Sequence, residues 1–184
     1  MKMQLEHGRP ADESDRQERE IRVYDLLDQL GIDFWRVDHD AARTMEDCAQ
    51  ADRLLGADTA ICKNLFLRNS KGSQYYLLML PGEKKFRAKN VAHQIGSTRL
   101  SFGEEEKMTE YLDILPGSVS VMGLMNDHDN QVELLIDEDV LKLPYVGCHP
   151  CMSTTSLKLT TKDLVEKFLP NVHHEPRTVV LSDG

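Results

Sequence analysis

The sequence lacks the long apolar stretches that membrane insertion or export would require. No apolar run among its 184 residues approaches the roughly 20 residues that span a bilayer. The first ten residues, Met1 to Pro10, contain no apolar core of a signal peptide. We therefore expect a cytoplasmic protein without a membrane partner.

Cysteine is also scarce, with four residues in the chain, and four are too few for a disulfide framework at this length. Cys148 and Cys151 have the spacing of a redox pair or of half a zinc site. A strand-like, threonine-containing run follows them instead of a helix, and the only further ligands, Cys48, Cys62 and 173–174, are scattered. We expect reduced thiols and no metal site, with a thiol or metal protein as an alternative.

The signatures of common nucleophile and cofactor enzymes are missing as well. The chain has no Ser-His-Asp order, no Gly-x-Ser-x-Gly elbow, no phosphate-binding loop and no dinucleotide glycine fingerprint. Any hydrolysis would therefore need water or a group of the substrate as the nucleophile. The sequence predicts no cofactor.

Positive charge is scarce overall but concentrated in one segment. The formal net charge is −9, yet the window from Lys63 to Lys89 holds seven basic residues against Glu83 alone, a local charge of +6. A basic face on an acidic body suits a phosphate-bearing partner such as tRNA, whereas a solvated run of charges is the alternative. The candidate RNA-binding residues are Lys63, Arg68, Lys84, Lys85, Arg87 and Lys89.

Hydrophobic periodicity predicts short strands and helices in irregular alternation. Residues 64–68 and 74–80 read as strands joined by a glycine-containing hairpin loop, and Thr44 as the N-cap of a helix ended by Gly56. Alternating small polar and apolar residues at 118–124 predict a further half-buried strand. We expect an α+β fold, with a mixed, curved central β-sheet flanked by helices, in a single domain of residues 14–184. Residues 1–13 are polar and are expected to be flexible.

The segment 143–156 is the main candidate for a functional site. It places His149, two cysteines and several hydroxyls between two strands, with Gly147 and Pro150 fixing the local backbone. Lys63 opens the apolar run 65–67, and a lysine in such a place either extends to solvent or binds an anion such as phosphate. We expect Lys63 and His149 to face each other across one pocket, although His149 as a structural histidine is the alternative.

These motifs together resemble a known family, the YbaK/prolyl-tRNA editing domains, which are aminoacyl-tRNA deacylases. The similarity is greatest to the free-standing branch that hydrolyses mischarged Ala-tRNA(Pro), and it extends from about residue 14 to residue 181. It rests on four groups of residues in the family order: 38–40 with 44–47, 62–67, 115–127 and 145–150.

The resemblance implies a role for Lys63 at the terminal tRNA phosphate, for His149 in positioning the aminoacyl ester, and for Gly117 in opening the loop beside the scissile carbonyl. The other positions that it implies, or that the neighbouring motifs suggest, as substrate contacts are His39, Thr44, Asn64, Ser118, Gly147, Pro150 and Ser153. The family is metal-free and is thought to use water together with the ribose hydroxyl of the substrate. Prolyl-tRNA synthetase is an implied partner.

The chain departs from the family pattern at two positions. Val121 stands where the family loop has proline, and Ser153 stands where relatives commonly have asparagine. Either departure affects which amino acid is removed or how fast. A non-catalytic binder of charged tRNA, with a decayed site, is therefore the second hypothesis.

Overall fold

A nine-stranded mixed sheet organises the protein, whose computed structural model describes residues 3–40 and 44–181. Three pairs of strands, β3 with β7, β4 with β6 and β6 with β9, are parallel, and the other pairs are antiparallel. The strands, in order across the sheet, are β1 (Leu5–His7), β2 (Phe34–Asp38), β8 (Thr155–Thr160), β7 (Tyr145–Cys148), β3 (Thr59–Arg68), β4 (Tyr75–Pro81), β6 (Val132–Asp137) and β9 (Arg177–Val179), with β5 (Ser101–Phe102) paired to β3. The mixed α+β architecture confirms the expectation from sequence.

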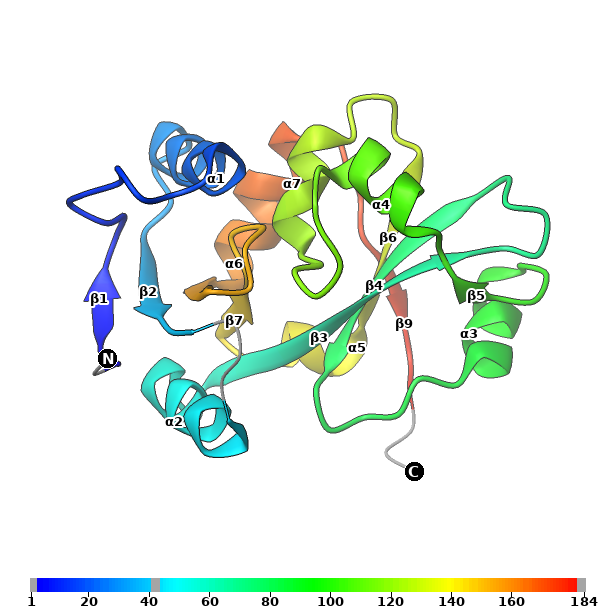
Figure 1. Cartoon of the computed structure of the whole chain (residues 1–184). Helices are drawn as coiled ribbons and strands as arrows, with labels where there is room; N and C mark the ends of the chain where they lie inside the picture. The colour runs from blue at the N-terminus through cyan, green and yellow to red at the C-terminus, as the bar shows by residue number, and fades with distance from the viewer. Residues whose placement is uncertain (1–2, 41–43, 182–184) are drawn as a thin grey trace.

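Helices cover both faces of this sheet (Figure 1). The α-helices are α1 (Glu18–Gln29), α2 (Met45–Leu55), α3 (Ala88–Ile95), α4 (Glu105–Leu112), α5 (Glu138–Lys142), α6 (Thr161–Asp163) and α7 (Leu169–Asn171). A 3-10 helix, η1 (Val121–Asn126), follows α4, and a π-helical turn, η2 (Leu164–Phe168), joins α6 to α7. None of the described helices is long and apolar enough to cross a membrane.

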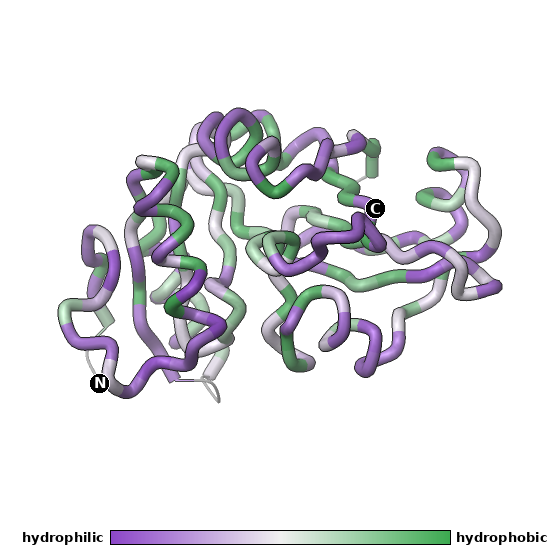
Figure 2. Tube along the Cα trace, turned by 90° about the horizontal axis from the view of Figure 1, so that it is seen from above, coloured by the Kyte–Doolittle hydropathy of each residue, from purple (hydrophilic) through white to green (hydrophobic). Residues whose placement is uncertain are grey.

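The sheet separates hydrophobic cores, because successive side chains of a strand point to opposite faces. In β4, Leu77 and Met79 pack in the larger core with residues of α1, α4 and η1, whereas Leu78 and Leu80 pack in a second core with α3. All of β4 is buried, as expected for a central strand covered on both sides. Viewed from above, the central strands are hydrophobic along most of their length, whereas most loops are hydrophilic (Figure 2).

The long strand β3 connects the two halves of the sheet. Its first residues pair with β7, and residues from Cys62 to Arg68 pair with β4 across the expected hairpin. Thr44 is confirmed as the N-cap of α2, and the structure adds a capping box: Thr44 Oγ1 accepts from the Asp47 amide at 3.1 Å, and the Asp47 carboxylate accepts from the Thr44 amide at 3.2 Å.

Two local predictions are wrong. The N-terminal segment is not uniformly flexible: Leu5–His7 forms edge strand β1, and Arg9 is paired with Glu13, Asp25 and Asp28. Residues 118–124 do not form a strand, because Ser120 caps η1 by accepting a hydrogen bond from the Met122 amide at 3.1 Å. Short hydroxyl side chains compete in this way with regular ladders for backbone partners.

Candidate active site

Lys63 lies in β3, and His149 is the first residue after β7, the parallel neighbour of β3. The ladder of β3 and β7 pairs Thr59 with Tyr145 and Ile61 with Gly147. If this register is continued by two residues, the position opposite Lys63 is that of His149. Both residues then project to the same face of the sheet, because each lies two positions beyond a paired residue.

The imidazole of His149 is held in one tautomer when it is neutral. Its Nδ1 lies 2.7 Å from the backbone oxygen of Thr155. A carbonyl oxygen only accepts hydrogen bonds, so Nδ1 carries the proton and Nε2 is the acceptor nitrogen. The Thr155 oxygen is available for this contact because the β7–β8 ladder ends at Cys148 and Leu157.

A second histidine lies beside the first. His39 is 4% exposed, and its Nε2 lies 2.9 Å from Ser156 Oγ. The rings of His39 and His149 meet edge to face, with their centroids 6.4 Å apart. The first two residues of β8 therefore hold both histidines.

The loop before η1 turns sharply at Gly117. The Ser118 amide donates to the Leu115 oxygen at 3.1 Å across Pro116 and Gly117, whose φ is 89°. Proline second and a positive φ third are the signature of a type II turn, which favours glycine at that position. An added Cβ would meet no atom within 4 Å, so the requirement for glycine is conformational and not steric.

Two hydrogen bonds join this loop to the segment that follows β7. Ser118 Oγ accepts from the Ser153 amide at 3.1 Å, and Ser120 Oγ donates to the His149 oxygen. The two loops thus form one unit around His149. Val121, where the family has proline, is the first residue of η1 and is fully buried in the larger core. Proline is tolerated at such a position because its amide has no partner within the helix.

Asn64 contributes an unpaired polar atom. Its Oδ1 is buried and has no hydrogen-bond partner among the described residues. A buried acceptor without a donor is uncommon in proteins, and a ligand that donates a hydrogen bond would satisfy it. Asn64 projects to the opposite face from Lys63, with its neighbours Cys62 and Phe66, toward the core that contains η1.

Three other predicted substrate contacts have structural roles. Thr44 exposes its backbone but uses its hydroxyl in the capping box of α2. Gly147 lies under α2, where an added Cβ would come within 3.5 Å of Leu55 and Thr59. Pro150 is buried after β7.

The cysteines of the segment are poorly suited to thiolate chemistry. Among the described residues, none of the four cysteines forms a disulfide. Burial raises the pKa of the Cys151 thiol to about 12 and also raises the pKa of Cys148. Burial of the Cys62 sulfur raises its pKa to about 12, although the residue as a whole is partly exposed. These thiols are therefore protonated at neutral pH, whereas redox exchange and metal binding need the thiolate. Within residues 3–40 and 44–181, no three His, Cys, Asp or Glu side chains are grouped to hold a metal ion.

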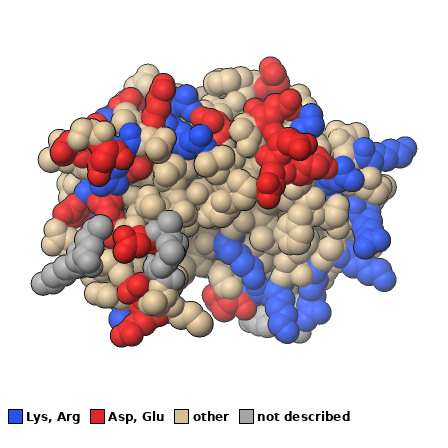
Figure 3. Space-filling model, in the orientation of Figure 1, with Lys and Arg blue, Asp and Glu red and all other residues tan. Residues whose placement is uncertain are grey.

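The predicted RNA-binding residues divide into two groups. Lys85, Arg87 and Lys89 are exposed at and before the start of α3. Arg68 is 32% exposed, and its guanidinium lies 2.5 Å from Glu104. Basic residues gather at the lower right of the molecule, whereas acidic residues gather at the left and top (Figure 3).

Lys84 is a correction to the sequence prediction. It is 3% exposed, and its Nζ lies 2.8 Å from Asp137 and 2.7 Å from Asp139 and donates to the Leu181 oxygen at 2.8 Å. A buried ammonium in this arrangement cannot reach a phosphate at the surface. Its neighbour Lys85 is exposed, and no feature of the sequence indicates the difference between the two lysines.

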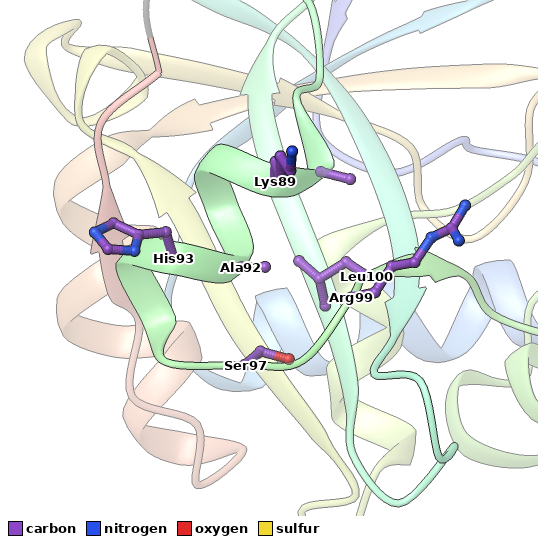
Figure 4. Close-up of a pocket in the computed structure, with 7 residues that line it drawn as sticks. Lys89, Ala92, His93, Ser97, Arg99 and Leu100 are labelled. Carbon is purple, nitrogen blue, oxygen red and sulfur yellow. The ribbon is translucent and has the colours of Figure 1, made fainter.

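A groove of about 730 Å³ lies beside α3, and it was not among the sites predicted from the sequence. Lys89 and His93 stand on α3, Arg99 and Ser97 come from the following segment, and Ala92 and Leu100 lie between them (Figure 4). Arg99 lies outside the basic window that the sequence identified. Arg99 lies ten residues after Lys89, and this spacing does not indicate that the two side chains line the same groove.

Comparisons with known proteins identify the family of the chain. The sequence profile of the family described as "Aminoacyl-tRNA editing domain" matches residues 39–167. The "Prolyl-tRNA editing protein ProX" of Acetoanaerobium sticklandii is 36% identical over 138 residues, which cover 75% of this chain and 83% of that protein. The "Prolyl-tRNA synthetase associated domain-containing protein 1" of Bos taurus is 28% identical over 155 residues, 82% of this chain and 88% of that protein.

A similar fold is present in a crystal structure described as that of a candidate trans-editing enzyme for prolyl-tRNA synthetase. The TM-score is 0.67 at 22% identity, over 91% of this chain and 99% of that chain. The family profile spans β3 with Lys63, the segment after β7 with His149, and the loop at Gly117. The resemblance found in the sequence is thus confirmed: the chain belongs to the aminoacyl-tRNA editing domain family, a family of aminoacyl-tRNA deacylases.

Proposed function

We propose that the protein cleaves the aminoacyl ester of mischarged tRNA in trans, and that its substrate is Ala-tRNA(Pro). The observation that carries the proposal is that His149, whose imidazole is oriented by Thr155, directly follows β7, the strand that pairs in parallel with the start of β3, which contains Lys63. The similarity to a protein named as a prolyl-tRNA editing protein supports the choice of tRNA.

In this proposal the Lys63 ammonium binds the phosphate of the terminal nucleotide. The Nε2 atom of His149 accepts a hydrogen bond from the ribose or from the attacking water, because Nδ1 already donates to Thr155. The turn at Gly117 leaves room for the ester carbonyl beside backbone amides, and such donors stabilise a developing oxyanion by roughly 3–4 kcal/mol each.

The chemistry needs no protein nucleophile. Water attacks the ester carbonyl, assisted by the neighbouring ribose hydroxyl of the substrate, and we propose that no metal ion takes part. The enzyme then acts as a sieve, because binding alone separates small apolar side chains by only about 1–3 kcal/mol. A site that admits alanine and excludes larger residues supplies the remaining discrimination.

The body of the acceptor end would lie along the basic face beside α3. Lys63 shares its face of β3 with Leu65 and Leu67, and both pack with α3 in the second core. The exposed cations Lys85 and Arg87 therefore flank the same face of the sheet. We further propose that prolyl-tRNA synthetase is a partner: the enzyme receives the mischarged tRNA either directly from the synthetase or after its release.

The test is hydrolysis of Ala-tRNA(Pro), with Pro-tRNA(Pro) and Ser-charged tRNA as comparators, with and without EDTA. We expect release of alanine that resists the chelator, and a loss of kcat/KM on the order of a hundredfold in Lys63→Ala, because an anion contact in a partly buried site is removed. Lys71→Ala, an exposed lysine in the β3–β4 loop, is the matched control and should keep activity.

Release of another amino acid would correct the specificity and leave the reaction class intact. Salt-sensitive tRNA binding without hydrolysis of any of these substrates would replace the proposal by that of a binding protein. Full activity in Lys63→Ala would remove Lys63 from its assigned role.

A further inference from the structure

A chain of hydrogen bonds and ion pairs leads from the N-terminal part of the fold to His149. Arg16, just before α1, makes two hydrogen bonds of 3.0 Å to the two carboxylate oxygens of Asp38. Thr155 Oγ1 donates to Asp38 Oδ1 at 3.0 Å and accepts from Arg16 at 3.2 Å. The backbone oxygen of Thr155 in turn accepts from His149 Nδ1. Thr155 is thus held on one side and holds His149 on the other.

The backbone geometry of β8 makes this coupling direct. The His39 amide donates to the Thr154 oxygen at 2.9 Å, so the Thr154 carbonyl points toward β2. Successive carbonyls of a strand point in opposite directions, and the Thr155 carbonyl therefore points toward β7. There the ladder has already ended, and the imidazole of His149 takes the place of a strand amide.

Asp38 is built to remain ionised in this position. Burial raises its pKa, but the hydrogen bond from Arg16 and the charge of Arg36 outweigh that effect and leave the pKa below its ordinary value. Arg36, which is 4% exposed, lies 3.1 Å from Asp38 and also pairs with Glu6 of β1. Arg16 is further fixed by Glu20, at 2.9 Å. Permanently charged partners give a rigid support because bidentate arginine–carboxylate pairs have a defined geometry.

We propose that Arg16, Asp38 and Thr155 are positioning residues that fix the tautomer and orientation of His149 in the editing reaction. Arg16 and Asp38 lie before residue 39, where the match to the family profile begins. The elements β1, α1 and β2 therefore help to hold His149 in position, in addition to forming one edge of the sheet. The inference rests on the proposed function in which His149 contacts the aminoacyl end of the substrate.

The chain offers a matched control for Arg16. Arg9 also ties the N-terminal segment to α1, through Glu13, Asp25 and Asp28 at 2.8–3.1 Å, and none of its ion pairs in the described part of the chain involves Asp38 or Thr155. Its side chain is 29% exposed, compared with 17% for Arg16. Arg9→Gln and Arg16→Gln therefore each remove the arginine from a cluster of ion pairs with α1. Only Arg16→Gln also removes contacts to Asp38 and Thr155, and thereby affects the support of His149.

The test combines histidine nitrogen NMR on the full chain with single-turnover deacylation of Ala-tRNA(Pro). Wild-type His149 should show a protonated Nδ1 and an unprotonated Nε2, with its signals assigned from a His149→Asn spectrum. In Arg16→Gln and Thr155→Val this signature should give way to a mixture of tautomers. The hydrolysis rate should fall on the order of tenfold with KM within about twofold, because orientation and not binding is lost.

Thr155→Ser, which restores the hydroxyl, should recover both readouts, and Arg9→Gln should change neither. An unchanged His149 signature in Thr155→Val, or equal rate losses in Arg9→Gln and Arg16→Gln, would reduce the network to a structural role and overturn the proposal. If the wild-type protein hydrolyses none of the substrates, the proposed function fails, whereas the NMR comparison still decides whether the network positions His149.

Discussion

One partly buried and one fully buried carboxylate end strands in opposite halves of the sheet, and the two serve different purposes. Asp38 is the last residue of β2 and Asp137 the last of β6. Asp38 binds two arginines and the hydroxyl of Thr155, whose carbonyl holds His149. Asp137 is fully buried, pairs with Lys84 and accepts from the Leu181 amide at 3.2 Å. Similar chemistry at a strand end supports the site in one half and anchors the C-terminal segment in the other.

Removing the cation of the C-terminal anchor should give the largest effect. Lys84→Met leaves Asp137 charged and without its ammonium in a fully buried position. Such changes cost about 3–5 kcal/mol of unfolding free energy. Urea unfolding should show this loss, whereas Lys85→Met, one residue later and exposed, should unfold as the wild type does. Equal stability of the two variants would mean that the buried pair contributes little.

A change in the site that touches neither carboxylate sharpens the comparison. Gly117→Ala puts a Cβ on a residue with a φ of 89°, and a left-handed conformation costs a residue with a side chain roughly 1–2 kcal/mol. We expect a comparable loss in unfolding free energy together with lower deacylation, because the turn relaxes. Val119→Ala, in the same loop, is the control, and a loss of stability without loss of activity would separate the turn from the reaction.

The exposed cations should affect RNA binding and leave both carboxylate networks intact. Lys85→Met and Arg87→Met should each weaken tRNA binding modestly and lower the slope of log K against log salt by about one. Filter binding at several salt concentrations measures this slope. Lys84→Met, measured under conditions where it is folded, should leave the slope unchanged. An unchanged slope in Lys85→Met would place the RNA elsewhere.

The smallest expected effect is that of Asp38→Asn on the pH dependence of the unfolding free energy. This dependence distinguishes Asp38 from an ordinary surface carboxylate. The pKa of Asp38 is lowered in the fold, so its ionised form contributes stability above its unfolded pKa of about 3.9. That contribution is lost as the pH falls through the lower, folded pKa. The stability difference between the wild type and Asp38→Asn should therefore be constant near pH 6 and shrink below about pH 4. Asp129→Asn, at an exposed position, should parallel the wild type throughout.

Local features of the fold could be predicted from the sequence because they depend on neighbouring residues. The N-cap at Thr44 and the β3–β4 hairpin are of this kind. The strand expected at 118–124 was wrong because alternation cannot distinguish a pleated strand from a loop whose serines bond to the backbone of a distant segment. Ser118 bonds to Ser153, which lies 35 residues away.

The support of the site could not be predicted because it depends on strand order. Asp38 and Thr155 are 117 residues apart and meet only because β2 pairs with β8. The different environments of Lys84 and Lys85 likewise follow from the position of Asp137 after folding. The sequence identified Lys63 and His149 as candidates from their chemistry and from a family resemblance, whereas the parallel pairing of β3 with β7, the strand just before His149, came from the structure.

The pairing of β2 with β8 also has a consequence for synthesis on the ribosome. In the described sheet, β2 has only the three-residue edge strand β1 as a partner until β8 has been made. The chain emerges from its N-terminus at about 5–20 residues per second, so α1 and β2 wait on the order of ten seconds with apolar surface uncovered. Slow codons before residue 155 should therefore lengthen the exposure of this apolar surface and increase aggregation.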